Sequence, residues 1–172
     1  SGVKKEGRQM KALFRVVLVV MLGLTLVACS KFKSYDGQPV TKIEVHKSER
    51  KLYLLNGKTV IKSYKIKLGG NPIGPKQFEG DGKTPEGAYY ITHKNPNSNY
   101  HLSLGISYPD ASDVAFAKAH GKPTGGDIFV HGGPRRRGQS GDWTAGCIAV
   151  TDQQIEEIYA MVRTGTPIFI FP

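Results

Sequence analysis

The feature that most limits the fold is a run rich in glycine and proline at residues 69–87, GGNPIGPKQFEGDGKTPEG. No helix or long strand persists across so many residues of these two types, so we expect a long loop built from turns. Before it, two short apolar runs at 51–55 and 59–66 are separated by Asn56-Gly57, which is a strong β-hairpin signal. The part of the chain before the loop is therefore expected to be antiparallel β-structure.

Most of the other apolar runs are also short, as strands are. They lie at 41–45, 88–92, 102–107, 127–130 and 167–171. Helices are expected at 110–120, with Asp110 as N-cap, and after Thr151, where Ile155 and Ile158 begin a helical repeat of apolar residues. The pattern predicts a mainly β domain, either a mostly antiparallel sheet or a small sandwich-like barrel, with one or two flanking helices.

The first 29 residues carry the features of an export signal. Lys11 and Arg15 precede an apolar run at 16–28, which is shorter than the roughly 20 residues that span a bilayer. The run ends in LVAC at 26–29, which resembles a bacterial lipobox. That resemblance implies cleavage before Cys29, acylation of this residue and a membrane anchor. An ordinary cleaved signal and an uncleaved short anchor are the alternatives, and an exported protein facing the periplasm or cell wall is expected.

These signals divide the chain into three parts. Residues 1–28 are upstream sequence and signal peptide, 29–38 are the acylated cysteine and a polar tether, and 39–172 are one folded domain. The formal net charge of +10 suits an anionic partner. Part of this positive charge lies before residue 29. After residue 29 the only dense run of basic residues is 135–137, so nucleic-acid binding is not expected.

Two residues of the domain carry the pattern of a cysteine nucleophile with its base. Cys147 lies in WTAGCIAV at 143–150, and a lone cysteine is by default a buried apolar residue. His131, however, follows a strand-like run and opens a Gly-Gly-Pro loop, so its imidazole is expected at a sheet rim where it can reach a thiol. Gly146 forms a Gly-Cys turn, which can aim backbone N–H groups at the oxygen of a tetrahedral intermediate.

These residues resemble the motif of the L,D-transpeptidase (YkuD) catalytic domain family, which is His-Gly followed by Ser/Thr-x-Gly-Cys. The matching residues are His131-Gly132 and 144–147 (TAGC), and residues 81–87 (DGKTPEG) are similar to the family's Gly-x-Thr-Pro-x-Gly element. The resemblance covers most of 39–172. It is nearest to the YafK-like branch of the family, to judge from 74–76, 107–109 and 146–151.

The resemblance implies a β-sandwich-like domain with a short helix, and it assigns roles to five residues. Cys147 would be the nucleophile, His131 its base, and the backbone carbonyl of Gly132 the group that orients the imidazole. The N–H groups of Gly146 and Cys147 would bind the oxyanion, and Thr144 would support the loop. No cofactor is implied. A zinc site is not expected either, because the histidines lack paired spacing and the exported domain has no second cysteine.

Three residues are candidates for substrate binding. Arg135 stands between His131 and Cys147, where it can bind substrate carboxylates or belong to a solvated loop. Trp143 is either a stacking lid or a packing anchor. Tyr108 belongs to one of the runs that resemble the YafK-like branch.

The prediction is therefore a membrane-anchored cysteine enzyme that acts on the stem peptides of peptidoglycan through a thioester. Resolution by an amine would give 3–3 crosslinks or attach a lipoprotein to the wall, whereas water would make the enzyme an amidase or carboxypeptidase. Most transpeptidases of the family carry polar residues where this chain has Ala145 and Ala149, so hydrolysis is slightly favoured.

A noncatalytic, membrane-tethered module that binds the cell wall is the alternative. Thiol reactivity separates the two, because an activated Cys147 is expected to have a depressed pKa and to label fast near neutral pH, and a buried structural thiol to be inert.

Overall fold

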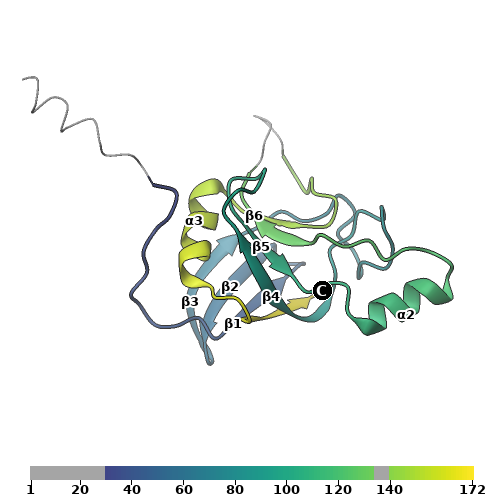
Figure 1. The fold of residues 1–172 in the computed structure, drawn as a ribbon, viewed down its shortest axis with the longest axis horizontal. Helices are drawn as coiled ribbons and strands as arrows, with labels where there is room; N and C mark the ends of the chain where they lie inside the picture. Colours follow the sequence, from purple (N-terminus) through teal and green to yellow (C-terminus); the bar gives the residue numbers. More distant parts are fainter. Residues whose placement is uncertain (1–29, 134–139) are drawn as a thin grey trace, which may run out of the picture. The chain divides into compact units, whose positions relative to one another are not determined.

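A single eight-stranded sheet forms most of the structure, a computed structural model that describes residues 30–133 and 140–172 (Figure 1). All eight strands belong to one unit of the chain, Phe32–Pro172. The strands lie in the order β3-β2-β1-β8-β4-β5-β6-β7. Their bounds are β1 Lys42–His46, β2 Lys51–Asn56, β3 Thr59–Lys65, β4 Gly87–Asn95, β5 Ser103–Ile106, β6 Phe129–His131, β7 Ile148–Ala149 and β8 Pro167–Phe171. The β1–β8 and β6–β7 pairs are parallel and the other neighbours are antiparallel, so the mainly β, mostly antiparallel prediction is confirmed.

The sheet curls until the chain that follows β3 meets β7. Lys67 and Ala149 exchange two backbone hydrogen bonds of 2.8 Å. Next to them, the N–H of Gly70 donates to the carbonyl of Thr144 at 3.0 Å. The start of the long loop is therefore bonded to the segment that carries Cys147.

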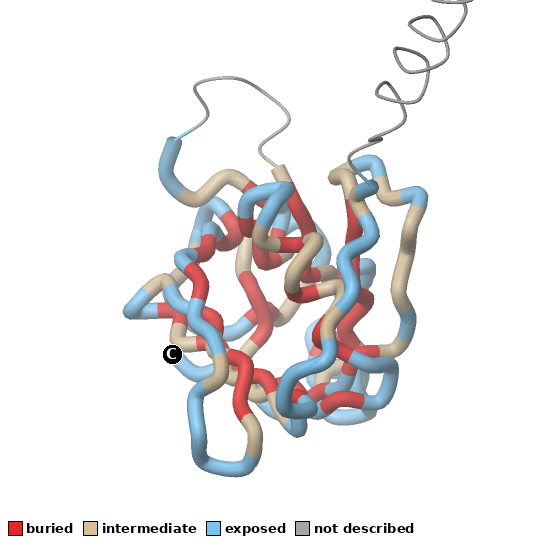
Figure 2. The backbone as a smooth tube through the Cα atoms, turned by 90° about the vertical axis from the view of Figure 1, so that its left-hand side faces the viewer, coloured by how far each residue is buried: buried red, intermediate tan, exposed pale blue. Residues whose placement is uncertain are grey.

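Alternate residues of the central strands fill the interior of the curled sheet. Ile43 and Val45 of β1 and Ile168 and Ile170 of β8 are almost completely buried. Figure 2 marks the buried residues of the chain in red. The apolar run of β8 is less buried than its composition predicts, because Phe169 is half-buried and Phe171 exposed on the other face. One face of this strand is turned to the core and the other is not.

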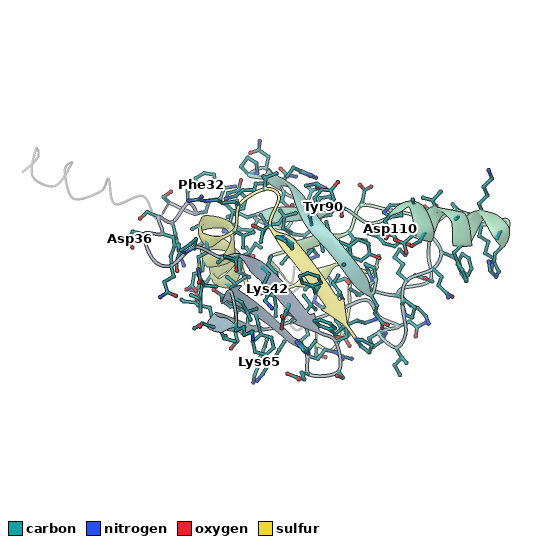
Figure 3. All side chains as sticks on the ribbon, turned by 90° about the horizontal axis from the view of Figure 1, so that it is seen from below. Phe32, Asp36, Lys42, Lys65, Tyr90 and Asp110 are labelled. Carbon is teal, nitrogen blue, oxygen red and sulfur yellow. The ribbon has the colours of Figure 1, made fainter. Side chains whose placement is uncertain are left out.

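Both expected helices are present, and each begins with a capping box. Helix α2 (Ala111–Ala119) starts after Asp110, and helix α3 (Asp152–Met161) starts after Thr151. Helix α3 buries Ile155, Ile158 and Met161 in the core, whereas α2 extends away from the sheet (Figures 1 and 3) and buries only Ala117. Within the two described ranges, no helix is long and apolar enough to cross a membrane.

The glycine- and proline-rich loop contains no helix and no long strand, as predicted, but two buried lysines hold it in place. Lys47 donates to the carbonyls of Gly74 and Thr84 and pairs with Glu86 at 2.8 Å. Lys76 pairs with Asp81 at 2.9 Å. Each buried ammonium is satisfied by carbonyl or carboxylate oxygens, so Lys47 ties the loop to the turn after β1 and Lys76 ties two parts of the loop together.

The packed chain begins at Phe32, ahead of the expected boundary at residue 39. The ring of Phe32 lies 6.2 Å from that of Tyr159 in α3, and Lys33 pairs with Glu156 at 3.4 Å. Tyr35 is partly buried against the core. Part of the segment expected to be a tether thus contacts α3, through Phe32 and Lys33 (Figure 3).

Candidate active site

Cys147 and His131 line one cavity of about 250 Å³. His131 is the last residue of β6 and Cys147 immediately precedes β7, the strand that pairs with β6 in parallel. Two neighbouring strands therefore bring together residues that are far apart in the sequence. The other residues that line the cavity are Asn95, Ser98, Asn99, Tyr100, Ser103, Asp127 and Phe129.

His131 is buried and its ring is fixed on both sides. Its Nδ1 lies 2.6 Å from the carbonyl oxygen of Gly132, so we assign the Nδ1 proton to this bond, which leaves Nε2 as the basic nitrogen. The ring stacks on Tyr100 at 4.3 Å and meets the edge of Trp143 at 5.7 Å. Burial lowers the pKa of His131, and the smaller effect of its hydrogen bond to the Gly132 carbonyl raises it. Because the net change is downward, the imidazole is neutral and can act as a base at neutral pH.

Cys147 is half-buried, and its thiol lies 3.5 Å from the backbone carbonyl of Asp127. Burial raises the pKa of Cys147, the backbone N–H of Phe129 opposes this, the charge of Asp127 raises the pKa further, and Lys76 lowers it. The expected depressed pKa is therefore not found in the resting site, because desolvation outweighs the groups that favour the thiolate. Such a thiol needs a base at the moment of attack.

Thr144 and Gly146 shape the turn before Cys147. The hydroxyl of Thr144 donates to the carbonyl of Cys147 at 2.7 Å and accepts from the N–H of Gly146 at 3.1 Å. Gly146 has φ +137°, and a Cβ there would lie 2.6 Å from the carbonyl oxygen of Lys83, so only glycine fits. The N–H groups of Gly146 and Cys147 are expected to bind an oxyanion. That of Gly146 already donates to the Thr144 hydroxyl, so the oxyanion site stays a prediction.

Of the candidates for substrate binding, Trp143 lies beside the site and Tyr108 does not. Trp143 is half-buried beside His131 and Tyr100 and lines a second cavity of about 420 Å³, together with Gly133 and Ala149. Tyr108 is not at the site. It is buried in the core and its hydroxyl donates to the carbonyl of Thr124, because its ring faces inward beside Tyr89.

Arg135, in the basic run, and the expected lipidation residue Cys29 lie outside the described residues.

Several polar residues of the cavity were missed by the sequence analysis. Asn95, Ser98 and Asn99 belong to the end of β4 and the turn that follows it, and Ser103 begins β5. The segment NPNSNY reads simply as a polar turn, and nothing in its spacing indicates a site. Among residues 30–133 and 140–172, no three His, Cys, Asp or Glu side chains gather in a way that could hold a metal ion.

Comparison with known proteins identifies the domain. Residues 41–170 match the YkuD family model, described as the L,D-transpeptidase catalytic domain. YafK of Escherichia coli (strain K12), whose description as an L,D-transpeptidase is itself provisional, is 32% identical over 176 residues, covering 88% of this chain and 65% of YafK.

Two solved structures share the fold. The helical cell shape determining protein Pgp2 of Campylobacter jejuni superposes with TM-score 0.62 and 27% identity over 79% of this chain and 49% of its own. Bd1075 of Bdellovibrio bacteriovorus superposes with TM-score 0.56 and 26% identity over 81% of this chain and 50% of its own. This chain thus spans less than two thirds of the length of YafK and about half of the two solved chains. By its sequence match and its fold, the chain belongs to the L,D-transpeptidase (YkuD) catalytic domain family.

Proposed function

We propose that this protein is a cysteine-dependent acyl-transfer enzyme that acts on the stem peptides of peptidoglycan. The observation that carries the proposal is the shared cavity of Cys147 and His131, with His131 Nδ1 held 2.6 Å from the Gly132 carbonyl. This arrangement leaves Nε2 available as the base for a thiol. A cell-wall substrate is supported by the family and by the description of Pgp2 as a cell shape determining protein.

The reaction has two halves. His131 Nε2 takes the thiol proton as Cys147 Sγ attacks an amide carbonyl of the stem peptide, and the tetrahedral intermediate expels an amine that takes this proton from the imidazolium. A thioester on Cys147 remains. In the second half, His131 accepts a proton from water or from an acceptor amine, which attacks the thioester and releases the thiol.

Hydrolysis is favoured slightly over transfer to an amine. Ala145 is exposed and Ala149 lines the 420 Å³ cavity. Two short apolar side chains provide no hydrogen-bonding group to hold an acceptor amine in place of water. The cavity around Cys147 has side-chain amides and hydroxyls, from Asn95, Ser98 and Ser103, that suit the backbone of a peptide.

Mass spectrometry of defined muropeptides incubated with the protein tests this proposal. The substrates include tetrapeptide stems and a stem that carries a lipoprotein-derived peptide. Release of D-Ala or of the attached peptide is expected in either case, because it accompanies thioester formation. Hydrolysis leaves no new dimers, whereas transfer to an amine adds 3–3 dimers. Cys147→Ala is expected to abolish the reaction, and His131→Ala to reduce kcat by about two to four orders of magnitude, the range for a general base.

The matched control is His120→Asn, which changes an exposed histidine at the end of α2 and is expected to leave the reaction unchanged. Turnover by Cys147→Ala at the parent rate overturns the mechanism. Binding to peptidoglycan without turnover by the unaltered chain would identify a wall-binding module instead.

We also propose that the protein is exported and held at a membrane through lipid on Cys29, as the LVAC sequence at 26–29 suggests. Labelling cells with an alkyne fatty acid tests this. The mature protein is expected to carry the label and to lose it, together with membrane association, in Cys29→Ala. Labelling that persists in this variant contradicts the proposal.

A further inference from the structure

A carboxylate lies on the far side of the peptide group that contacts His131. The peptide between Gly132 and Gly133 accepts from His131 Nδ1 at its carbonyl oxygen, 2.6 Å away. The N–H of the same peptide donates to Oδ1 of Asp152 at 2.9 Å. Imidazole, peptide and carboxylate therefore form one chain of hydrogen bonds.

We propose that Asp152 is a positioning residue for the acyl-transfer reaction, acting through the Gly132–Gly133 peptide to orient His131 and stabilise its protonated form. The inference rests on the proposed function, since it assigns this role at the same site. Asp152 touches neither the thiol cavity nor the imidazole, and it acts only through the shared peptide.

The physical basis is the polarisation of one peptide group from both ends. A carboxylate that accepts from the N–H draws positive charge to that end of the peptide and leaves the carbonyl oxygen more negative. Hydrogen bonds in such chains strengthen one another. The Gly132 carbonyl thus becomes a better acceptor when His131 takes the thiol proton and becomes a cation. In serine proteases a buried carboxylate performs this role directly on the histidine, whereas Asp152 is an exposed residue that acts through a peptide group.

Close packing shows that the contact is built into the fold. A Cβ on Gly132 would lie 2.5 Å from Asp152 Oδ1, 2.9 Å from the carbonyl oxygen of Tyr100 and 3.0 Å from Ile155. Glycine at 132 therefore lets the carboxylate approach the peptide. Asp152 is also the first residue of α3, so the start of this helix fixes the place of its side chain beside the Gly132–Gly133 peptide.

In the described part of the chain, three other titratable groups share the cavity with His131. Cys147, Asp127 and Tyr100 line the cavity with it, on other segments of the sheet and its loops. Among the described residues, Asp152 is the carboxylate bonded to the peptide behind the imidazole. A change at Asp152 can therefore be separated from changes on the cavity side.

The test compares Asp152→Asn with the unaltered full chain in mild detergent, with three readouts. An amide side chain can still accept from the Gly133 N–H but carries no charge. We expect a lower pKa of His131 in an NMR titration, slower alkylation of Cys147 by iodoacetamide near pH 7, and a kcat on muropeptides reduced about tenfold with little change in KM. Asp152→Ala removes the acceptor as well and is expected to have larger effects, and Asp152→Glu to recover part of them.

Glu156→Gln is the matched control. It removes a carboxylate from the same helix, one that pairs with His101 and Lys33 rather than with the active-site peptide. If the pKa of His131 is unchanged in Asp152→Asn, the inference is overturned even if kcat falls. A fall in kcat alone would be explained by a purely structural role of Asp152. An equal effect of Glu156→Gln also overturns it. The titration and the alkylation need no peptidoglycan, so an inactive chain that shows both effects contradicts only the proposed function.

Discussion

Cys147 is held in a site that favours the thiol over the thiolate. Burial raises its pKa most, and the nearby carboxylate of Asp127 adds to this. His131, which burial keeps neutral, is then needed to take the proton as the bond to the substrate forms. A thiol of this kind is protected from chance oxidation, because the thiolate is the reactive form.

The pH dependence of alkylation measures this directly. Because the pKa of Cys147 is raised above the ordinary thiol value, the thiolate fraction is small at pH 7 and we expect the rate to keep rising beyond pH 8.5. Iodoacetamide labelling from pH 5.5 to 10 gives the profile. A plateau that is complete below pH 7 would mean that the resting site already holds a thiolate–imidazolium pair.

Asp127→Asn is expected to lower the pKa of Cys147, because it removes a negative charge near the thiol. The thiolate fraction then grows, and we expect the alkylation rate at pH 7.5 to rise about threefold. The backbone of Asp127 has φ +55°, which asparagine tolerates well, so the fold is expected to remain. A rate that falls, or stays equal to the parent rate, contradicts this electrostatic role.

At the scale of elements, the segment that carries the TAGC motif is held to its neighbours by a carboxylate of its own, Asp142. Asp142 accepts from the backbone N–H of Leu68 at 2.9 Å and from Arg50 Nη2 at 2.8 Å. The carbonyl of Leu68 in turn accepts from the N–H groups of Trp143 and Thr144. The β1–β2 turn, the segment directly after β3 and the motif segment therefore share a single network.

Asp142→Ala is expected to lower the free energy of unfolding by about 2 kcal/mol, because it leaves a backbone N–H and a guanidinium without their acceptor. Urea denaturation followed by circular dichroism measures the change. Asp142→Asn keeps an acceptor for Leu68 and is expected to cost less. Lys62→Ala, which breaks an exposed pair with Glu157, is the control and is expected to change stability by less than about 1 kcal/mol. Equal losses in Asp142→Ala and Lys62→Ala would contradict the role of the network.

At the scale of the whole domain, the packed chain extends to within three residues of the expected lipidation site. Phe32 and Lys33 contact α3, and Tyr35 packs against the core. A lipid anchor on Cys29 would thus leave the catalytic domain little free chain. Substrate stems would have to lie close to the membrane surface.

Removing residues 30–38 is expected to destabilise the domain by about 2 kcal/mol, since the partly buried ring of Tyr35 and the exposed ring of Phe32 lose their contacts. Thermal unfolding of chains that begin at Ser30 and at Pro39 measures the loss. The double variant Phe32→Ser, Tyr35→Ser in the longer chain is expected to reproduce most of it. Equal melting temperatures for the two chain lengths would show that the segment is a free tether.

The sequence alone predicts the parts of this protein whose signals are local. Asn56-Gly57 gives the hairpin turn and Asp110 and Thr151 give the helix caps, because each depends on residues a few positions away. The run at 69–87 excludes helix and long strand by composition. His131 and Cys147 stood out for their neighbours in the chain and for their resemblance to a family motif.

Only the tertiary structure decides what depends on pairing between distant segments. The β6–β7 pair brings His131 and Cys147 into one cavity, the curled sheet joins Lys67 to Ala149, and α3 places Asp152 behind the Gly132–Gly133 peptide. Tyr108 shows the reverse. Its resemblance to a family motif made it a candidate for substrate binding, but the fold buries its side chain in the core. The raised pKa of Cys147 belongs here too, because burial is a property of the packed molecule and not of the residues beside it in the chain.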